Sequence, residues 1–119
     1  MVITGDGCML MQGMELATAS KYQRNILFVV FNNTFYAASY FNNKDNRTDL
    51  TQIPDYDWCQ LAKGLGLNSL CVNSPEQLQK HIADIMQQNS PFLIEIKCDK
   101  QHATPNKEYN KRIKTLPLL

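Results

Sequence analysis

The chain has 119 residues, a hydrophobic fraction of 44% and a formal net charge of +1 at pH 7. This length predicts a single small domain, and the near-neutral charge gives no basis for binding nucleic acid or a membrane surface. The 4 cysteines form no CxxC pair, and no apolar stretch approaches the roughly 18 residues that span a bilayer, so we expect a reduced, soluble, cytoplasmic protein.

The first predicted element is a short strand, Met1–Thr4, which ends in the turn Gly5-Asp6-Gly7. Its apolar residues are typical of a buried strand, and a buried strand at the first residue has nothing before it to pair with. We therefore expect the chain to begin inside a domain. The segment Met11–Tyr22 follows and has helical character, with small residues that allow close packing on a sheet.

The second predicted strand is the apolar run Ile26–Phe31, whose β-branched and aromatic residues are typical of a strand covered on both faces. It ends in the doublet Asn32-Asn33. The polar stretch Asn42–Tyr56 predicts a loop. Asp57 is then placed to cap a helix over residues 58–66 that ends at one of its two glycines.

The last part of the chain predicts strand, helix and strand. Ser69–Val72 is the third predicted strand. Ser74-Pro75-Glu76-Gln77 is a strong helix start, with serine at the cap, proline at the first helical position and glutamine where a capping box closes. The apolar face of that helix is predicted to hold Leu78, Ile82, Ile85 and Met86.

The fourth predicted strand is Phe92–Ile96, an apolar run that Glu95 interrupts. Strands and helices therefore alternate along the chain. This order predicts an α/β fold, with a parallel sheet and right-handed crossover helices.

Two polar clusters follow neighbouring predicted strands. Gly5-Asp6-Gly7 ends the first and Asn32-Asn33 ends the second, so a crossover helix would bring both to one edge of the sheet, where open α/β sheets bind ligands. Backbone N–H groups near a helix start favour phosphate, and a carboxylate beside phosphate requires a cation between them. Mg²⁺ suits such oxygen ligands. The sequence therefore predicts a site for a hard cation that carries a diphosphate.

These residues resemble the thiamine-diphosphate-binding motif of the acetolactate synthase and 2-oxo acid decarboxylase family. The resemblance rests on Gly5-Asp6-Gly7, the segment Glu15–Ala19, the strand that ends in Asn32-Asn33, and the separation from Asp6 to Asn33 (33 − 6 = 27). It covers roughly residues 1–105 and implies the C-terminal part of a thiamine-diphosphate domain. Residues 106–119 are then a basic C-terminal tail.

The resemblance also implies a set of site residues. It gives Mg²⁺ the side chains of Asp6 and Asn33 and the main-chain carbonyl of Phe35. It places no catalytic residue in this chain. The residues that it assigns to the cofactor are Gly5, Asp6, Gly7, Cys8, Asn33, Phe35, Tyr36 and Ala37, with Ala38 and Ser39 near the reacting carbon.

In this family the cofactor supplies the carbanion chemistry, and a glutamate from a more N-terminal domain activates it, usually across a dimer interface. The resemblance therefore implies a 2-oxo acid substrate, a homo-oligomer, and further domains or a partner subunit that carries the glutamate. The isolated chain is expected to be inactive.

Two alternatives remain open. One is a non-catalytic interaction module that keeps the fold, which is favoured by Cys8 where serine or alanine is usual and by Ala37 where glycine is common. The other is an unrelated Mg²⁺-dependent phosphatase or phosphoacceptor domain that uses Asp6. That alternative requires a second acidic residue nearby, and none precedes Glu15.

Overall fold

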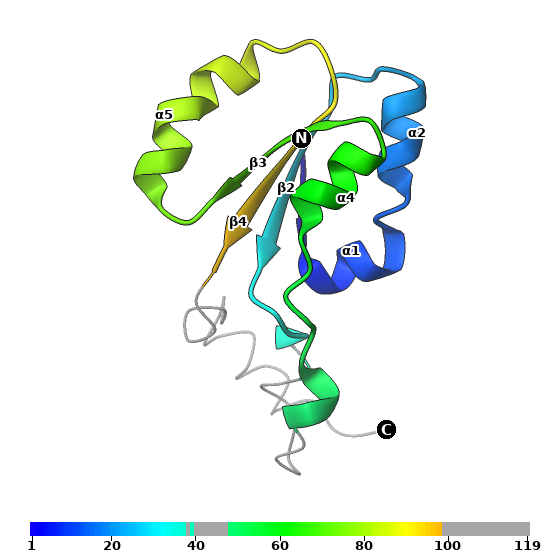
Figure 1. Cartoon of the computed structure of the whole chain (residues 1–119), viewed down its shortest axis with the longest axis vertical. Coiled ribbons are helices and arrows are strands. Elements are labelled where there is room, and N and C mark those ends of the chain that lie inside the picture. The colour runs from blue at the N-terminus through cyan, green and yellow to red at the C-terminus, as the bar shows by residue number, and fades with distance from the viewer. Residues whose placement is uncertain (38, 40–47, 99–119) are drawn as a thin grey trace, which may run out of the picture.

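A four-stranded parallel sheet forms the centre of the fold. The computed structural model describes residues 1–37, 39 and 48–98. The strands pair in the order β1-β2-β4-β3, all parallel, which confirms the predicted α/β fold. Their carboxyl ends consequently lie at one edge of the sheet (Figure 1). The bounds are β1 Val2–Gly5, β2 Leu27–Asn32, β3 Asn68–Val72 and β4 Phe92–Lys97.

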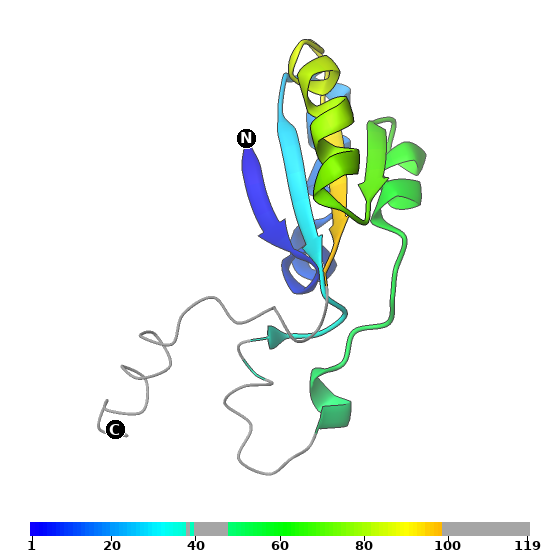
Figure 2. The ribbon, with the colours of Figure 1, turned by 90° about the vertical axis from the view of Figure 1, so that its left-hand side faces the viewer.

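Helices cover both faces of the sheet. On one face lie α1 (Asp6–Gln12), α2 (Glu15–Lys21) and α4 (Trp58–Gly64), while α5 (Pro75–Met86) lies alone on the other among the described helices (Figures 1 and 2). A short 3₁₀ turn, η1 (Thr48–Thr51), precedes α4. No helix in the described ranges is both long and apolar enough to cross a membrane.

The segment between β1 and β2 differs from the single helix predicted over Met11–Tyr22. α1 begins at Asp6, directly after the strand, and the helix is interrupted near Gly13 before α2 starts. At the break the hydrogen bonds tighten to i→i+3, with Leu16 N–H donating to Gly13 O at 3.2 Å. Gly7 therefore lies in the first helical turn, whereas the sequence predicted it in a turn before the helix.

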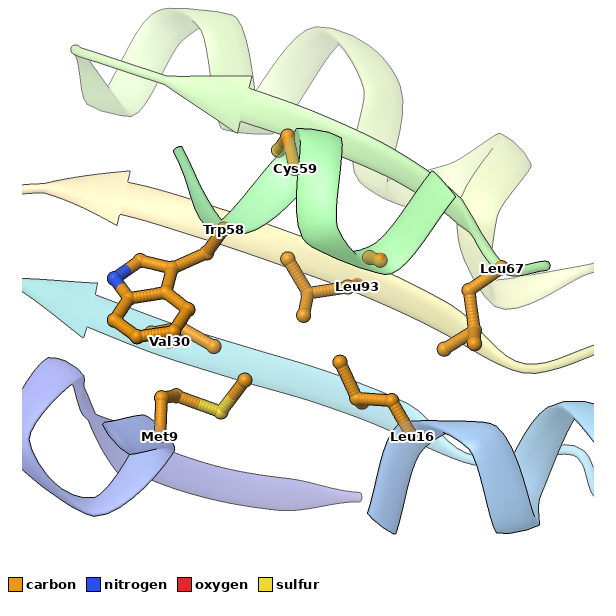
Figure 3. Close-up of a cluster of buried hydrophobic side chains, with 8 residues drawn as sticks. Met9, Leu16, Val30, Trp58, Cys59, Leu67 and Leu93 are labelled. Atoms are coloured by element: carbon orange, nitrogen blue, oxygen red, sulfur yellow. The ribbon is translucent and has the colours of Figure 1, made fainter. Parts of the chain in front are cut away.

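Side-chain alternation along the strands divides the core into two clusters. Val30 of β2 and Leu93 of β4 face the α1–α2–α4 layer, where they pack with Met9, Leu16 and Trp58 (Figure 3). On the α5 side the buried members are Val72, Ile85, Phe92 and Ile94. Met86, which was predicted on this apolar face, is exposed instead.

β1 is an exposed edge strand and not the buried strand that its composition predicted. Among the described strands it pairs with β2 alone, and the side chain of Ile3 is 61% exposed. The prediction failed because it took an apolar run to mean a buried strand with neighbours on both sides, whereas β1 ends the described sheet. α5 packs against β3 and β4 and leaves the β1 half of its face uncovered (Figure 2).

The predicted helix caps of α4 and α5 are confirmed. Asp57 accepts a hydrogen bond from Gln60 N–H at 2.8 Å, and Ser74 accepts one from Gln77 N–H at 3.4 Å. The Gln77 side chain reaches back to Asn73 N–H at 2.8 Å, one residue before the cap. The glycine that follows α4 is Gly66, at φ +87°.

Gly66→Ala is expected to destabilise the fold by about 1–2 kcal/mol, because a side chain disfavours left-handed backbone by that amount. A Cβ at this position would also meet Ser20 Oγ at 2.6 Å. Gly64→Ala is the matched control, since a Cβ there has no heavy atom within 4 Å. Urea unfolding should show a loss for the first variant alone. Equal midpoints for both variants would contradict the expectation.

Candidate functional site

Asp6 is the first residue of α1 and is only 3% exposed. Its Oδ1 accepts a hydrogen bond from Gly7 N–H at 2.9 Å, and its Oδ2 accepts one from Thr34 N–H at 2.7 Å. Burial raises the pKa of Asp6 although these hydrogen bonds oppose the shift. Burial therefore disfavours the ionised carboxylate, and a nearby cation would reverse this effect.

The segment that follows β2 is held in an unusual backbone conformation. Thr34 has φ +63°, a left-handed value that is disfavoured for a β-branched residue. Its N–H is bonded to Asp6, and its carbonyl accepts Ile53 N–H at 2.8 Å. Next to it, Asn33 Oδ1 accepts Phe35 N–H at 3.2 Å. Such strain persists only where surrounding bonds fix it, and it is common at functional sites.

A short antiparallel contact completes this part of the molecule. Phe35 bridges Gln52, and Tyr36 N–H donates to Thr51 O at 2.9 Å. Phe35 and Ile53 are both buried at the contact. The segment that precedes α4 thus supports residues 34–36 from behind. These contacts consequently fix the backbone conformation of residues 34–36, beside Asp6.

A cavity of about 280 Å³ opens between the end of β1, the start of α1 and the segment after β2. Each of the eight residues that were predicted to bind the cofactor lines it. Three further residues, Met11, Phe31 and Ser39, complete the described lining. Ala38 lies outside the described residues. Asn33 lines the cavity, whereas its neighbour Asn32 points into a buried polar network on the α4 side of the sheet.

The donors in this cavity suit a cation bound to an anionic group. Among the described lining residues, Asp6 supplies a carboxylate and there is no lysine, arginine or histidine. An anion placed beside Asp6 therefore needs a metal ion between them. The backbone at Gly7 is also crowded, because a Cβ there would meet the Tyr36 ring at 2.7 Å. Oxygen donors of this kind match Mg²⁺.

The family model described as "Thiamine pyrophosphate enzyme, C-terminal TPP binding domain" matches residues 1–96. Thiamine pyrophosphate is another name for thiamine diphosphate. The chain belongs to the thiamine pyrophosphate enzyme family. The match confirms the resemblance inferred from the strand-end motifs. The predicted boundary at residue 105 and the basic tail lie outside both the matched and the described residues, so they stay predictions.

Named relatives in this family carry several activities. The chain is 28% identical over 109 residues to a probable acetolactate synthase large subunit of Methanocaldococcus jannaschii, a match that covers 87% of this chain and 18% of the relative. It is 32% identical over 104 residues to a 3D-(3,5/4)-trihydroxycyclohexane-1,2-dione hydrolase of Bacillus subtilis, covering 80% of this chain and 16% of the hydrolase. The chain thus spans less than a fifth of these relatives' length.

A solved structure supports the same assignment. The thiamine diphosphate-dependent 4-hydroxybenzoylformate decarboxylase of Rhodococcus jostii RHA1 superposes with a TM-score of 0.74 at 25% identity. The match covers 82% of this chain and 19% of the decarboxylase. This thiamine pyrophosphate enzyme domain therefore shares its fold with a solved member of the family.

A second group of metal-ligand atoms lies on the α4 side of the sheet in this family member. Ligand atoms of Asp57, Cys59 and Glu95 lie within 4.8 Å of one another. Burial raises the pKa of Cys59 to about 11, so its thiol is protonated, and Lys97 Nζ already lies 2.9 Å from the Glu95 carboxylate. The protonated thiol and the neighbouring ammonium both oppose a cation at this position.

Sequence reasoning missed the role of Glu95. This residue is only 1% exposed and anchors a polar network around Asn32. The signal was present, because a carboxylate inside an apolar strand requires a buried partner. The partner could not be identified from local sequence, since Asn32 is 63 positions away.

Proposed function

We propose that this chain binds the diphosphate of thiamine diphosphate through Mg²⁺, as part of an enzyme that acts on 2-oxo acids. Asp6 and Asn33 would hold the metal by side-chain oxygens and Phe35 by its carbonyl. Gly7 and Cys8 would face the diphosphate with backbone N–H groups at the start of α1, where the helix dipole favours negative charge, and the Gly7 N–H would exchange Asp6 Oδ1 for a phosphate oxygen. Bound thiamine diphosphate supplies the carbanion chemistry of such enzymes.

The observation that carries this proposal is the buried carboxylate of Asp6 in a cavity with no cationic side chain among its described lining residues. Burial raises the pKa of this carboxyl, and a divalent ion beside it would stabilise the ionised form. The names of the relatives favour acetolactate-synthase-like carboligation or a decarboxylation. Both reactions begin beside the carbonyl of a 2-oxo acid.

The proposed enzyme needs more polypeptide than this chain. The relatives named above are about four to five times as long, and the exposed side chains of Val2 and Ile3 on β1 offer a surface for further structure. Additional domains or a partner subunit would supply the activating glutamate in a homo-oligomer. We accordingly expect the isolated chain to bind the cofactor without turning over a 2-oxo acid.

A second candidate is a non-catalytic interaction module that retains the fold. It is favoured by the engagement of Asn33 Oδ1 with Phe35 N–H, which turns the amide oxygen toward its own backbone. The Tyr36 ring also lies against Gly7, where the diphosphate would approach. This candidate predicts no metal-dependent binding of the cofactor.

Titration calorimetry on the 119-residue chain separates the two candidates. Thiamine diphosphate is expected to bind in the presence of Mg²⁺ and to lose most of its affinity when EDTA removes the metal. The carboxylate of Asp6 would repel an unshielded diphosphate, which explains the expected loss. Equal heats with and without the metal, or none in either case, would favour the interaction module.

A further inference from the structure

A buried polar network lies on the α4 face of the sheet, behind the cavity. Asn32 ends β2 and is 2% exposed, and its Nδ2 donates to Glu95 Oε1 at 2.7 Å. Lys97 Nζ lies 2.9 Å from the same oxygen, and Cys59 N–H donates to Glu95 Oε2 at 3.3 Å. The buried carboxylate therefore has both a charge partner and two hydrogen-bond donors.

Asp55 joins this network from the segment that precedes α4. Its Oδ1 lies 2.5 Å from Lys97 Nζ and accepts a hydrogen bond from Asn32 Nδ2 at 3.1 Å. The neighbouring Tyr56 carbonyl accepts from the same amide at 3.3 Å. The ends of β2 and β4 thus hold Asp55 and Tyr56 in one place.

The same segment, residues 51–56, also supports one wall of the cavity. This wall is formed by residues 34–36, of which Phe35 and Tyr36 line the cavity. At its start, Thr51 O accepts Tyr36 N–H and Ile53 N–H donates to Thr34 O. A few residues later, at its end, the segment is fixed by the bonds of Asp55 and Tyr56 to Asn32 and Lys97. Two anchors on so short a segment leave its backbone little freedom. Residues 34–36 inherit that order through their two backbone hydrogen bonds.

We propose that Asp55, paired with Lys97, is a positioning residue that orders the wall of the proposed diphosphate site through residues 51–56. It touches neither the metal nor the cofactor in this arrangement. Asp55 holds residues 51–56 in place, and we call this segment the strut. The strut fixes Thr34 and Tyr36 by hydrogen bonds, and Thr34 N–H in turn donates to Asp6. This inference rests on the proposed function for its ligand, but its effect on the wall is measurable without one.

The chemistry of the pair favours a local role over a global one. The side chain of Asp55 is 62% exposed, so its loss removes little buried contact. A hydrogen bond from Lys97 lowers the pKa of Asp55, so its carboxylate stays ionised at neutral pH. Glu95 keeps Lys97 and Asn32 as partners when Asp55 is removed. The core of the network therefore survives, while the end of the strut keeps the hydrogen bond from Asn32 to the Tyr56 carbonyl and loses its bonds through Asp55.

Asp55→Ala tests this proposal, with Asp57→Ala as the matched control. Asp57 lies two residues further on and caps α4 through Gln60 N–H, outside the strut. Hydrogen exchange is measured on the unliganded chain at the amides of Tyr36 and Ile53. These amides donate the backbone hydrogen bonds described above between the strut and the wall. We expect Asp55→Ala to speed their exchange about 10-fold with an almost unchanged Tm. Asp57→Ala should lower Tm by about 4–8 °C. It should not change the exchange of the Tyr36 and Ile53 amides more than that of other amides.

Titration of the same variants with Mg²⁺ and thiamine diphosphate adds a second readout. Asp55→Ala should bind up to about 10-fold more weakly than the wild type, because loss of a residue that bonds a metal ligand directly costs about 10–100-fold and Asp55 acts through Thr34. Wall amides that exchange equally in Asp55→Ala and the wild type would overturn the positioning role. If the wild type itself binds no cofactor, the proposed function fails, and the exchange measurement still decides whether Asp55 orders the wall.

Discussion

Asp6→Ala is expected to weaken Mg²⁺-dependent binding of thiamine diphosphate by at least about 100-fold, measured by titration calorimetry on the whole chain. Loss of a residue behind a metal ligand typically costs 10–100-fold, so loss of a charged ligand should cost no less. The substitution removes the carboxylate that the described lining residues contribute to the cavity. Without it, the described lining residues offer the metal only neutral protein oxygens.

The fold should survive this change, which makes the binding result interpretable. Burial raises the pKa of Asp6, so its ionised form costs free energy in the metal-free protein, and removing it offsets part of the lost hydrogen bonds. Asp6→Asn keeps an oxygen that can accept Thr34 N–H and should bind the metal almost as poorly as alanine. Retention of wild-type affinity in Asp6→Asn would argue against a metal at this carboxylate.

Glu15→Gln serves as the control for charge alone. Glu15 is exposed on α2, accepts a hydrogen bond from Thr18, and is not among the residues that line the cavity. Its substitution removes the same unit of negative charge from the chain. We expect unchanged affinity, because an exposed charge outside the site is screened by solvent and salt. A loss similar to that of Asp6→Ala would point to a general electrostatic effect.

The sequence was informative where local rules decide the outcome. Gly5-Asp6-Gly7 and Asn33 come together because parallel strands present their carboxyl ends at one edge. The caps at Asp57 and Ser74 follow from side chains that bond to the next helical turn. Each of these inferences needs only neighbouring residues or the direction of the strands.

Inferences that depend on distant contacts were less successful. The exposure of β1 depends on which half of the sheet α5 covers, and that choice is not written in the strand itself. Asp6, at the start of α1, accepts a hydrogen bond from Thr34, which lies 28 positions away and is not identified by local sequence. The partnership of Glu95 with Asn32 and Lys97 likewise needs the strand register, Val30 beside Glu95 and Asn32 beside Lys97.

That partnership predicts a large effect on stability. Lys97→Met keeps the aliphatic length of the side chain and removes the ammonium that lies 2.9 Å from the buried Glu95 carboxylate. Breaking a buried pair typically costs 3–5 kcal/mol because a charge is left uncompensated. The Lys97 side chain is 31% exposed, so solvent screens part of the interaction and a loss of about 2–3 kcal/mol is expected. Denaturant unfolding at pH 7 measures it.

The double variant Glu95→Gln/Lys97→Met shows whether the lost stability comes from the uncompensated charge. It should recover at least about 1 kcal/mol relative to Lys97→Met, because a neutral amide needs no ammonium beside it. No recovery would mean that Lys97 stabilises the fold by packing rather than charge.

Acid should reduce the difference between the wild type and Lys97→Met. Lys97 lowers the pKa of Asp55 below its ordinary value of 3.8, so the small stability that this exposed pair contributes is present above that pH. It is lost as the pH falls through the lowered pKa and Asp55 takes up a proton. Asp6 titrates in both proteins, and its effect cancels in the comparison. A difference in unfolding free energy that stays constant down to about pH 2 would show that the ion pair between Asp55 and Lys97 contributes nothing to stability.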